Sequence, residues 1–296
     1  MTWIYFAVSA YLLLAISGVI DKFLVSKVVR HPAAYAFYIG ITGPFSLLLA
    51  PFGLKMISVS DFYIAAVAGA CFVLGMYYYF TAVSKASVSR ILPIFGGLLP
   101  LFTLILAYFA LNERLDFSQY WAFAFLVFGT ILLAYKKEAG GLQKSALAYS
   151  ALAALLMALT AVLSKHIFEV SNFVSGMVWT RMSFLPVALL FLLTPENRQR
   201  ILRAPKQARA GNIVIYYTSR FSGSVAGFLQ NYAVSLGSVT VVNALQGTQF
   251  VFLLGLTTGL SLYFPKVLKE QISKGILQQK ILAIVLISLG LFFLTR

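Results

Sequence analysis

The segment AVSKASVSR (residues 82–90) returns 151 positions later as AVSLGSVTV (residues 233–241), with five identities in nine positions. Each copy is followed by a long apolar run, a turn that carries a glutamate (Glu113 and Glu270), and a further apolar run. Chance accounts poorly for a match in segment order, short loop and acidic turn together. We therefore expect an internal repeat.

Ten apolar runs, bounded by charge, proline or turn residues, make up most of the chain. Each is close to the length of about 20 residues that a helix needs to cross a bilayer. They lie at residues 3–25, 33–54, 61–83, 88–111, 117–135, 145–167, 173–194, 212–235, 238–263 and 276–295. Five spans per copy is an odd number, so the second copy is inverted relative to the first. We predict an all-α integral membrane protein of ten transmembrane helices, with repeats at residues 1–138 and 139–296 around a central cavity.

The composition supports a membrane protein. Of the 296 residues, 60% are strongly apolar and 10% are charged, whereas an ordinary soluble domain is about half apolar and about a quarter charged. The mean hydropathy is +0.89. These values exclude a soluble enzyme, a collagen, a disulfide scaffold and a disordered chain, and they predict a multi-pass protein of the cell membrane, plasma or inner.

The charge distribution predicts an orientation. The net charge of +15 comes from 23 Lys and Arg against 8 Asp and Glu. Seventeen of these cations lie in the loops after the first, third, fifth, seventh and ninth runs, and four lie on the opposite side. The positive-inside rule then places both termini outside. Cations dispersed in short loops do not form the clustered basic face that nucleic-acid binding needs.

The duplicated five-span layout resembles the drug/metabolite transporter superfamily, in its ten-helix EamA-like branch. The resemblance rests on the short connections KASVSRILPI (85–94) and LGSVTVVNAL (236–245), together with the glutamate-bearing turns ALNERLDFSQ (110–119) and VLKEQISKG (267–275). It covers essentially the whole chain, and the order of the motifs is more specific than any one of them.

The resemblance implies a basket-like helical bundle whose central cavity is lined by the first four helices of each half. It also implies transport of a small metabolite, with no bound cofactor. The chain departs from the family pattern in two ways. Members are usually drawn with cytoplasmic termini, which conflicts with the charge distribution, and the stretch PKVLK (265–269) is inserted before Glu270.

Two arginines lie inside apolar runs, each about nine residues from the run's start: Arg181 and Arg220. A charge inside a span is costly by several kcal/mol, so both are candidates for substrate binding. Arg220 and Asn231 share one helical face with Ser224 and Gly227. The arginine fork suits a carboxylate or a phosphate. The alternative is that each arginine pairs internally or caps freed carbonyls.

The acidic residues all lie in loops or at the ends of spans, with none near the middle of a run. A carrier of lipophilic cations normally needs such a carboxylate to attract substrate and to bind the coupling proton. Its absence favours an anionic or zwitterionic substrate.

Further candidates for the substrate site lie in the fourth and ninth runs. Asn243, Gln246 and Gln249 follow one face of the ninth run and would bind polar groups of the substrate. At the corresponding place the fourth run carries helix-disrupting residues that predict a kink: Pro93, Gly97 and Pro100. Freed N–H groups at such a kink can hold an anion; close helix packing through glycine is the alternative.

Aromatic residues complete the predicted site. Tyr78, Tyr38 and Trp179 would contact an apolar part of the substrate, although interfacial aromatic belts account for many such residues. His31, His166 and the single Cys71 form no metal-spaced cluster, so we expect neither a metal nor an enzyme.

We therefore predict a secondary transporter of a small polar metabolite, working by alternating access as a monomer or homodimer among membrane lipids. The expected substrate is an amino acid, an organic acid, or a phosphorylated or nucleotide-linked sugar. The alternatives are a carrier of neutral or cationic amines or drugs, and a non-transporting, lipid-binding membrane protein whose polar faces hold helices together.

Overall fold

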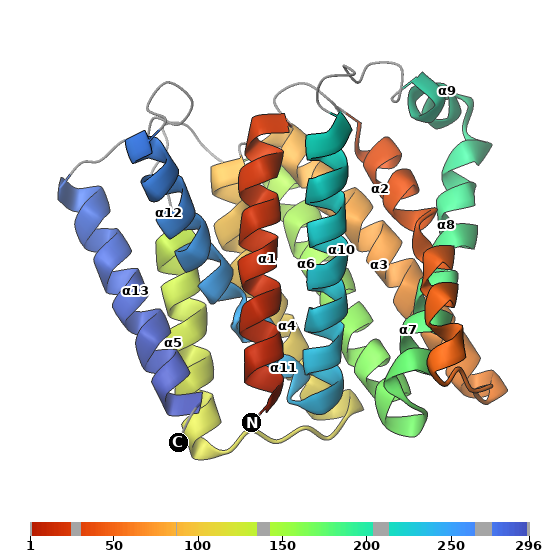
Figure 1. Cartoon of the computed structure of the whole chain (residues 1–296), viewed down its shortest axis with the longest axis horizontal. Helices are drawn as coiled ribbons and strands as arrows, with labels where there is room; N and C mark the ends of the chain where they lie inside the picture. Colours follow the sequence, from red (N-terminus) through yellow and green to blue (C-terminus); the bar gives the residue numbers. More distant parts are fainter. Residues whose placement is uncertain are drawn as a thin grey trace. The chain divides into compact units, whose positions relative to one another are not determined.

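A computed structural model of the chain describes residues 2–24, 31–86, 88–134, 143–203, 213–263 and 274–294. Within these ranges, the side chains of residues 21–24, 88–90, 93, 134, 213–220, 260–263 and 274–277 lie outside the description. All regular structure in the described ranges is helical (Figure 1).

The helices follow the predicted runs closely. They are α1 (Thr2–Leu24), α2 (Pro32–Gly40), the 3₁₀ helix η1 (Gly43–Phe52), α3 (Val59–Lys85), α4 (Val88–Ala110), α5 (Phe117–Ala134), α6 (Lys144–Val170), α7 (Phe173–Met182), α8 (Phe184–Leu190), the 3₁₀ helix η2 (Phe191–Leu193), α9 (Pro195–Arg203), α10 (Ile213–Leu236), α11 (Val239–Ala244), α12 (Gln246–Tyr263) and α13 (Lys274–Leu294). The main difference is that the second, seventh and ninth runs are each interrupted.

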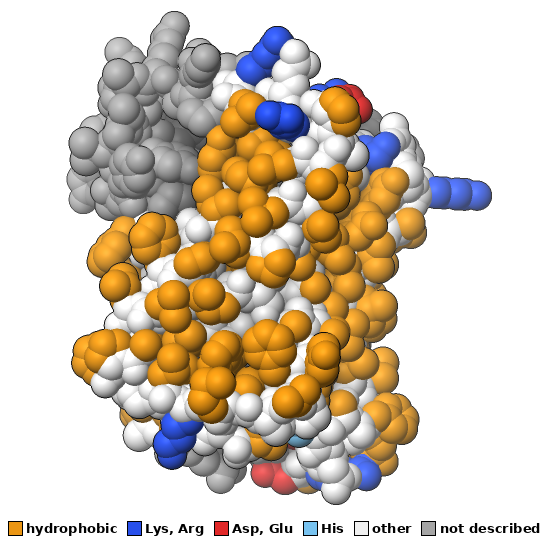
Figure 2. Space-filling view, turned by 90° about the vertical axis from the view of Figure 1, so that its right-hand side faces the viewer, with side chains coloured by type: hydrophobic (Ala, Val, Ile, Leu, Met, Phe, Trp, Pro, Cys, Tyr) orange, Lys and Arg blue, Asp and Glu red, His pale blue; other side chains and the backbone are white. Residues whose placement is uncertain are grey.

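Many of these helices are suited to a bilayer. Among the described residues, six segments are long and apolar enough to cross it: Thr2–Ile20, Pro32–Phe52, Val59–Lys85, Lys144–Val170, Phe173–Leu193 and Val239–Gly259. Three shorter apolar helices are Ile94–Ala110, Phe117–Leu133 and Gln278–Leu294. Figure 2 shows one face where hydrophobic side chains form a broad band, with Lys and Arg at its upper and lower edges. The number of ten spans stays a prediction.

The helices pack as two compact units, and each unit takes helices from both halves of the sequence. The first unit comprises Met1–Lys27, Arg114–Lys137 and Arg209–Arg296. The second unit comprises Val28–Glu113 and Glu138–Ala208. The boundaries of these units do not coincide with the predicted repeats at 1–138 and 139–296. The division into units does not test whether the two halves of the sequence share one fold, so the repeats stay a prediction.

In the first unit, α1 packs against α10 and α12, and α5 packs against α13 (Figure 1). α5 and α13 approach each other closely because each helix has a glycine at the contact. A Cβ at Gly129 would lie 2.7 Å from Ile287 Cγ1, and one at Gly290 would lie 2.7 Å from Leu126 Cγ. Leu126 and Ile287 are themselves fully buried. Small residues thus allow two apolar helices to interlock without a hydrophobic driving force in lipid.

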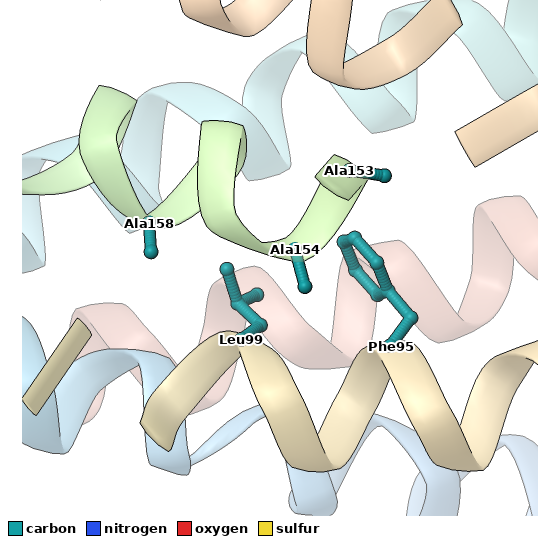
Figure 3. Close-up of a cluster of buried hydrophobic side chains, with 5 residues drawn as sticks. All are labelled: Phe95, Leu99, Ala153, Ala154 and Ala158. Atoms are coloured by element: carbon teal, nitrogen blue, oxygen red, sulfur yellow. The ribbon is translucent and has the colours of Figure 1, made fainter. Parts of the chain in front are cut away.

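In the second unit, α6 packs against both α3 and α4. Figure 3 shows the α4–α6 contact, where Phe95 and Leu99 of α4 meet three buried alanines of α6: Ala153, Ala154 and Ala158. Large side chains on one helix fill the shallow surface that the alanines leave on the other. This contact is apolar throughout its labelled residues.

The repeated segment forms a similar helix corner in each unit. α3 ends at Lys85 and α4 begins after two intervening residues, as α10 ends at Leu236 and α11 begins after two. In both corners the first residue past the helix donates its backbone N–H to a carbonyl four residues earlier, at 3.1 Å from Ala86 and 3.0 Å from Gly237.

Candidate functional site

Two helix breaks lie side by side in the second unit, between α2 and η1 and between α7 and α8. α2 ends at Gly40, four residues before Pro44, and α7 ends at Met182, four residues before Pro186. Proline has no N–H to donate, and its ring clashes with the carbonyl four residues earlier. The two prolines therefore account for the positions of both breaks.

The backbone of η1 approaches α7 closely at Gly43. A Cβ built on Gly43 would fall against the carbonyl oxygen of Arg181 and would lie 3.0 Å from Phe184 Cβ. Gly40 is similarly placed, since its Cβ would lie 2.5 Å from that of Ala188. Glycine at these two positions lets the broken helices touch through their backbones.

Arg181 stands at this contact, on the penultimate residue of α7. Its side chain is half-buried, and its guanidinium has no hydrogen-bond or ion-pair partner among the described residues. A cation inside a span normally pairs with another side chain or with carbonyls. The unpaired fork of Arg181 is therefore available to bind a carboxylate or a phosphate through two parallel hydrogen bonds.

An aromatic cluster in the second unit contains the predicted Tyr78. Its ring stacks on that of Tyr149, with centroids 5.8 Å apart, and meets that of Tyr77 edge-on at 5.3 Å. Tyr77 also contacts Phe191 at 5.3 Å, and the Lys85 ammonium lies 5.7 Å from the Tyr149 ring centre. The hydroxyls of these three tyrosines make no hydrogen bond to any described residue. They can accept or donate hydrogen bonds to a polar substrate.

The other two predicted aromatics hold segments of the second unit in place. The Tyr38 hydroxyl donates to the Ile201 carbonyl of α9 at 2.9 Å. The Trp179 indole N–H donates to the Lys55 carbonyl at 3.0 Å, beyond the end of η1. Their role in substrate contact stays a prediction.

The first unit has its own helix break, at Leu245 between α11 and α12. No proline stands in the four residues that follow. Instead, the backbone N–H and the hydroxyl of Thr248 both donate to the Leu245 carbonyl, at 2.9 and 2.7 Å. Gly247 lies so close to α5 that a Cβ there would fall against the Thr130 hydroxyl. The break therefore depends on a tertiary contact and on side-chain hydrogen bonding.

Two of the predicted polar residues flank this break. Asn243 is 3% exposed, on α11, and Gln246 is half-buried, at the start of α12. The side-chain oxygen of Gln246 is buried and accepts no hydrogen bond from any described residue. An unpaired buried acceptor is unfavourable by about 1–3 kcal/mol, so we expect it to receive a donor from bound substrate.

Tyr11 and Gln230 extend this polar group, and reasoning from the sequence missed both. The Tyr11 hydroxyl, 1% exposed, donates to the Val242 carbonyl at 2.7 Å and accepts from the Gln230 amide at 3.3 Å. A tyrosine in an apolar run resembles an interfacial aromatic. One available signal was Gln230, a polar residue that directly precedes the predicted Asn231.

Replacing Tyr11 with phenylalanine is expected to destabilise the first unit by about 1–2 kcal/mol, because the Val242 carbonyl and the Gln230 amide lose a buried partner. Thermal unfolding of the purified protein in detergent measures this. Tyr5→Phe is the matched control, since Tyr5 lies on the same helix and is 77% exposed. Equal unfolding temperatures for the two variants would contradict the expectation.

The remaining predicted polar residues also lie in the first unit. Arg220 is on α10, and its side chain lies outside the described residues. Asn231 donates its amide to the Gly227 carbonyl of its own helix at 2.8 Å. Gln249 is half-buried on α12.

The predicted kink falls in α4, which runs as one helix from Val88 to Ala110 through all three residues. Gly97 and Pro100 are buried, and the side chain of Pro93 lies outside the description. The kink stays a prediction. Among the described residues, no group of three or more His, Cys, Asp or Glu is placed to hold a metal.

Comparison with known proteins gives a family match over part of the chain. Residues 1–135 match the EamA-like transporter family, which confirms the resemblance seen in the sequence over those residues. A solved structure described only as a protein crystal structure is similar in fold, with a TM-score of 0.68 and 16% identity over 98% of this chain and 96% of that one. The search of curated proteins returns no match.

Proposed function

We propose that this chain, whose residues 1–135 match the EamA-like transporter family, is a secondary transporter of a small anionic or zwitterionic metabolite. The family indicates a membrane transporter of the drug/metabolite type, which takes a small-molecule substrate in a lipid environment. It points to transport rather than catalysis. The more specific part of the proposal, the charge of the substrate, rests on the side chains described above.

Arg181 is the observation that carries the proposal. Its half-buried guanidinium has no partner among the described residues, and it stands where two interrupted helices touch. A purely structural arginine at this depth would bind carbonyls or a carboxylate. We propose that a carboxylate or phosphate of the substrate takes that place, as amino acids, organic acids and phosphorylated or nucleotide-linked sugars would provide.

In the first unit, a separate group of residues is proposed to bind polar groups of a substrate. The unpaired Gln246 oxygen accepts an N–H or O–H group. Asn243, Asn231 and Gln249 supply further amides, and Arg220 a second cation. In the second unit, the free hydroxyl of Tyr78 serves the same purpose at the edge of the aromatic cluster.

We propose alternating access between two inverted repeats, residues 1–138 and 139–296. Matching contacts support this arrangement. α3 packs on α6 as α10 packs on α1, and α4 packs on α6 as α12 packs on α1. Interrupted helices are the usual moving and binding elements of such transporters. The breaks at Ser183 and Leu245 are the proposed places of bending, with both termini on the outer side.

A carrier of amines is the second candidate, and the aromatic cluster favours it. Tyr77, Tyr78 and Tyr149 present ring faces and edges that attract a cationic group. Lys85 lies over the Tyr149 ring and would repel such a group. This contact makes the anionic or zwitterionic substrate the better-supported proposal.

The test is a ligand panel on the purified protein in detergent, read by unfolding temperature. The panel contains amino acids, organic acids, sugar phosphates, nucleotide sugars and quaternary amines. A ligand that binds only the folded state stabilises it by mass action, by about 2.7 kcal/mol at a hundred times its Kd. Stabilisation by an anion, lost in Arg181→Gln, supports the proposal. Stabilisation by amines alone, equal in both proteins, contradicts it.

A further inference from the structure

α9 is a short amphipathic helix held to the second unit by one face. Figure 1 shows it turned away from the direction of α8, which precedes it. Ile201 is 1% exposed, and its carbonyl accepts the Tyr38 hydroxyl of α2 at 2.9 Å. This bond and the buried isoleucine determine which face of α9 points away from the unit.

The outward face of α9 combines an exposed leucine with two arginines. Leu202 is 60% exposed, and Arg198 and Arg203 are both exposed. At about 100° per residue, Leu202 lies about 40° from Arg198 and about 100° from Arg203, between them on the helix surface. An apolar side chain flanked by cations is the pattern of helices that lie in the membrane interface.

The two arginines differ from their neighbour Arg200 in having no ion pair within the part of the chain that the structure describes. Arg200 pairs with Glu196 one turn earlier. Arg198 and Arg203 have no acidic partner among the described residues. Burial, and then the positive charge of Arg200, holds the pKa of His31 below its ordinary value, so this nearby side chain is neutral at pH 7. The positive charge available on this helix therefore lies at Arg198 and Arg203.

α9 follows directly on a surface that faces hydrocarbon. Leu189 and Leu190 of α8 are exposed, and Leu193 is 76% exposed just before α9 begins. Exposed leucines on a membrane-spanning segment contact acyl chains. The band of hydrophobic side chains in Figure 2 likewise ends at an edge with Lys and Arg. Exposed leucines followed by exposed arginines are the order of residues expected where a chain passes from acyl chains to lipid headgroups.

We propose that α9 binds the headgroup phosphate of an anionic phospholipid through Arg198 and Arg203, with Leu202 inserted among the acyl chains. The unpaired positive charge selects an anionic lipid over a zwitterionic one. The hydrogen bond between the Tyr38 hydroxyl and the Ile201 carbonyl then connects the lipid-binding helix to α2. Arg198, Leu202 and Arg203 are not among the proposed substrate contacts, and the proposal does not depend on the identity of the substrate.

A fluorophore on Leu202→Cys in a Cys71→Ala background reads the lipids beside α9 directly, because Cys71 is the single cysteine of the chain. The protein is placed in phosphatidylcholine nanodiscs, and quenching is compared between spin-labelled phosphatidylglycerol and spin-labelled phosphatidylcholine. We expect the anionic lipid to quench more strongly. R198Q/R203Q should lower its relative association constant about thirtyfold, which corresponds to about 2 kcal/mol for two arginines.

Three comparisons test the site. K55Q/K144Q removes the same amount of positive charge from two exposed positions away from α9, one after η1 and one at the start of α6. It should leave the preference for the anionic lipid unchanged. R198K/R203K keeps the positive charge and should retain most of the preference for the anionic lipid. Inorganic phosphate should not abolish quenching by the anionic lipid. The proposal is overturned by equal quenching from both lipids, by a preference that survives R198Q/R203Q, by an equal loss in K55Q/K144Q, or by full displacement with inorganic phosphate.

Discussion

Replacing Arg181 with glutamine is expected to weaken binding of the anionic substrate about a hundredfold, which corresponds to about 2.7 kcal/mol. Loss of a bidentate, charge-assisted contact accounts for a change of this size. The same substitution should raise the free energy of unfolding without substrate by about 1–3 kcal/mol, because it removes an unpaired charge from a membrane span. Weaker binding with greater stability is typical of a residue retained for function.

Two measurements on one set of variants check this expectation. The unfolding temperature is recorded without ligand, and the Kd is measured for the panel compound that stabilises the wild type. Arg181→Lys keeps the charge without the planar fork and should weaken binding about tenfold. Lys144→Gln is the control, since it removes one positive charge from an exposed position outside both proposed sites and should change neither quantity by much.

A structural role for Arg181 would give a different pair of results. If the guanidinium held the helix break together, Arg181→Gln would lower the unfolding temperature, and substrate affinity would fall only as far as the fold was damaged. Unchanged affinity in Arg181→Gln would remove the observation on which the proposed function rests.

Replacing Gly43 with alanine is expected to destabilise the second unit by about 3 kcal/mol. The new Cβ would fall against the Arg181 carbonyl and lie 3.0 Å from Phe184 Cβ, so two backbones must separate. Overpacking of this kind is unfavourable by about 1–3 kcal/mol. Because the shift moves the residue that bears the guanidinium, substrate affinity should fall as well. Thermal unfolding and the Kd of the panel compound measure the two effects.

Gly255→Ala is the matched control for this substitution. A Cβ at Gly255 on α12 meets no atom within 4 Å, and alanine favours a helix over glycine by about 1 kcal/mol. The control should therefore be as stable as the wild type or slightly more so. If Gly43→Ala behaves like Gly255→Ala, the close contact between η1 and α7 is not needed for folding.

The helix breaks show both what the sequence predicts and where it falls short. Pro44 and Pro186 each stand four residues after a break, where a proline removes a backbone hydrogen bond. Pro93 and Pro100 stand inside the continuous helix α4, so a proline by itself does not decide where a helix breaks. Apolar length alone nevertheless suggested uninterrupted spans at 33–54 and 173–194. The break at Leu245 has no proline. It follows from the approach of Gly247 to Thr130 on α5, which no local pattern contains.

The residues of the candidate site likewise fall into those that the sequence predicts and those that only the structure reveals. Arg181 and Gln246 were predicted because a charged or amide group in an apolar run is unusual by itself. Tyr11 was not, because its hydroxyl finds the Val242 carbonyl across 231 residues of sequence. A tyrosine in an apolar run looks alike whether it faces lipid or a neighbouring helix.

The sequence by itself determined that this protein is helical, apolar and a multi-pass membrane protein, and its first 135 residues are similar to the EamA-like transporter family. Hydrophobic length, proline positions and a repeated segment are local properties that survive without any knowledge of packing. Only the tertiary structure decided which helices share a unit, that Arg181 has no partner among the described residues, and that Arg198 and Arg203 differ from the paired Arg200. These features depend on which side chains meet across distant segments, and helices of similar composition offer many such pairings.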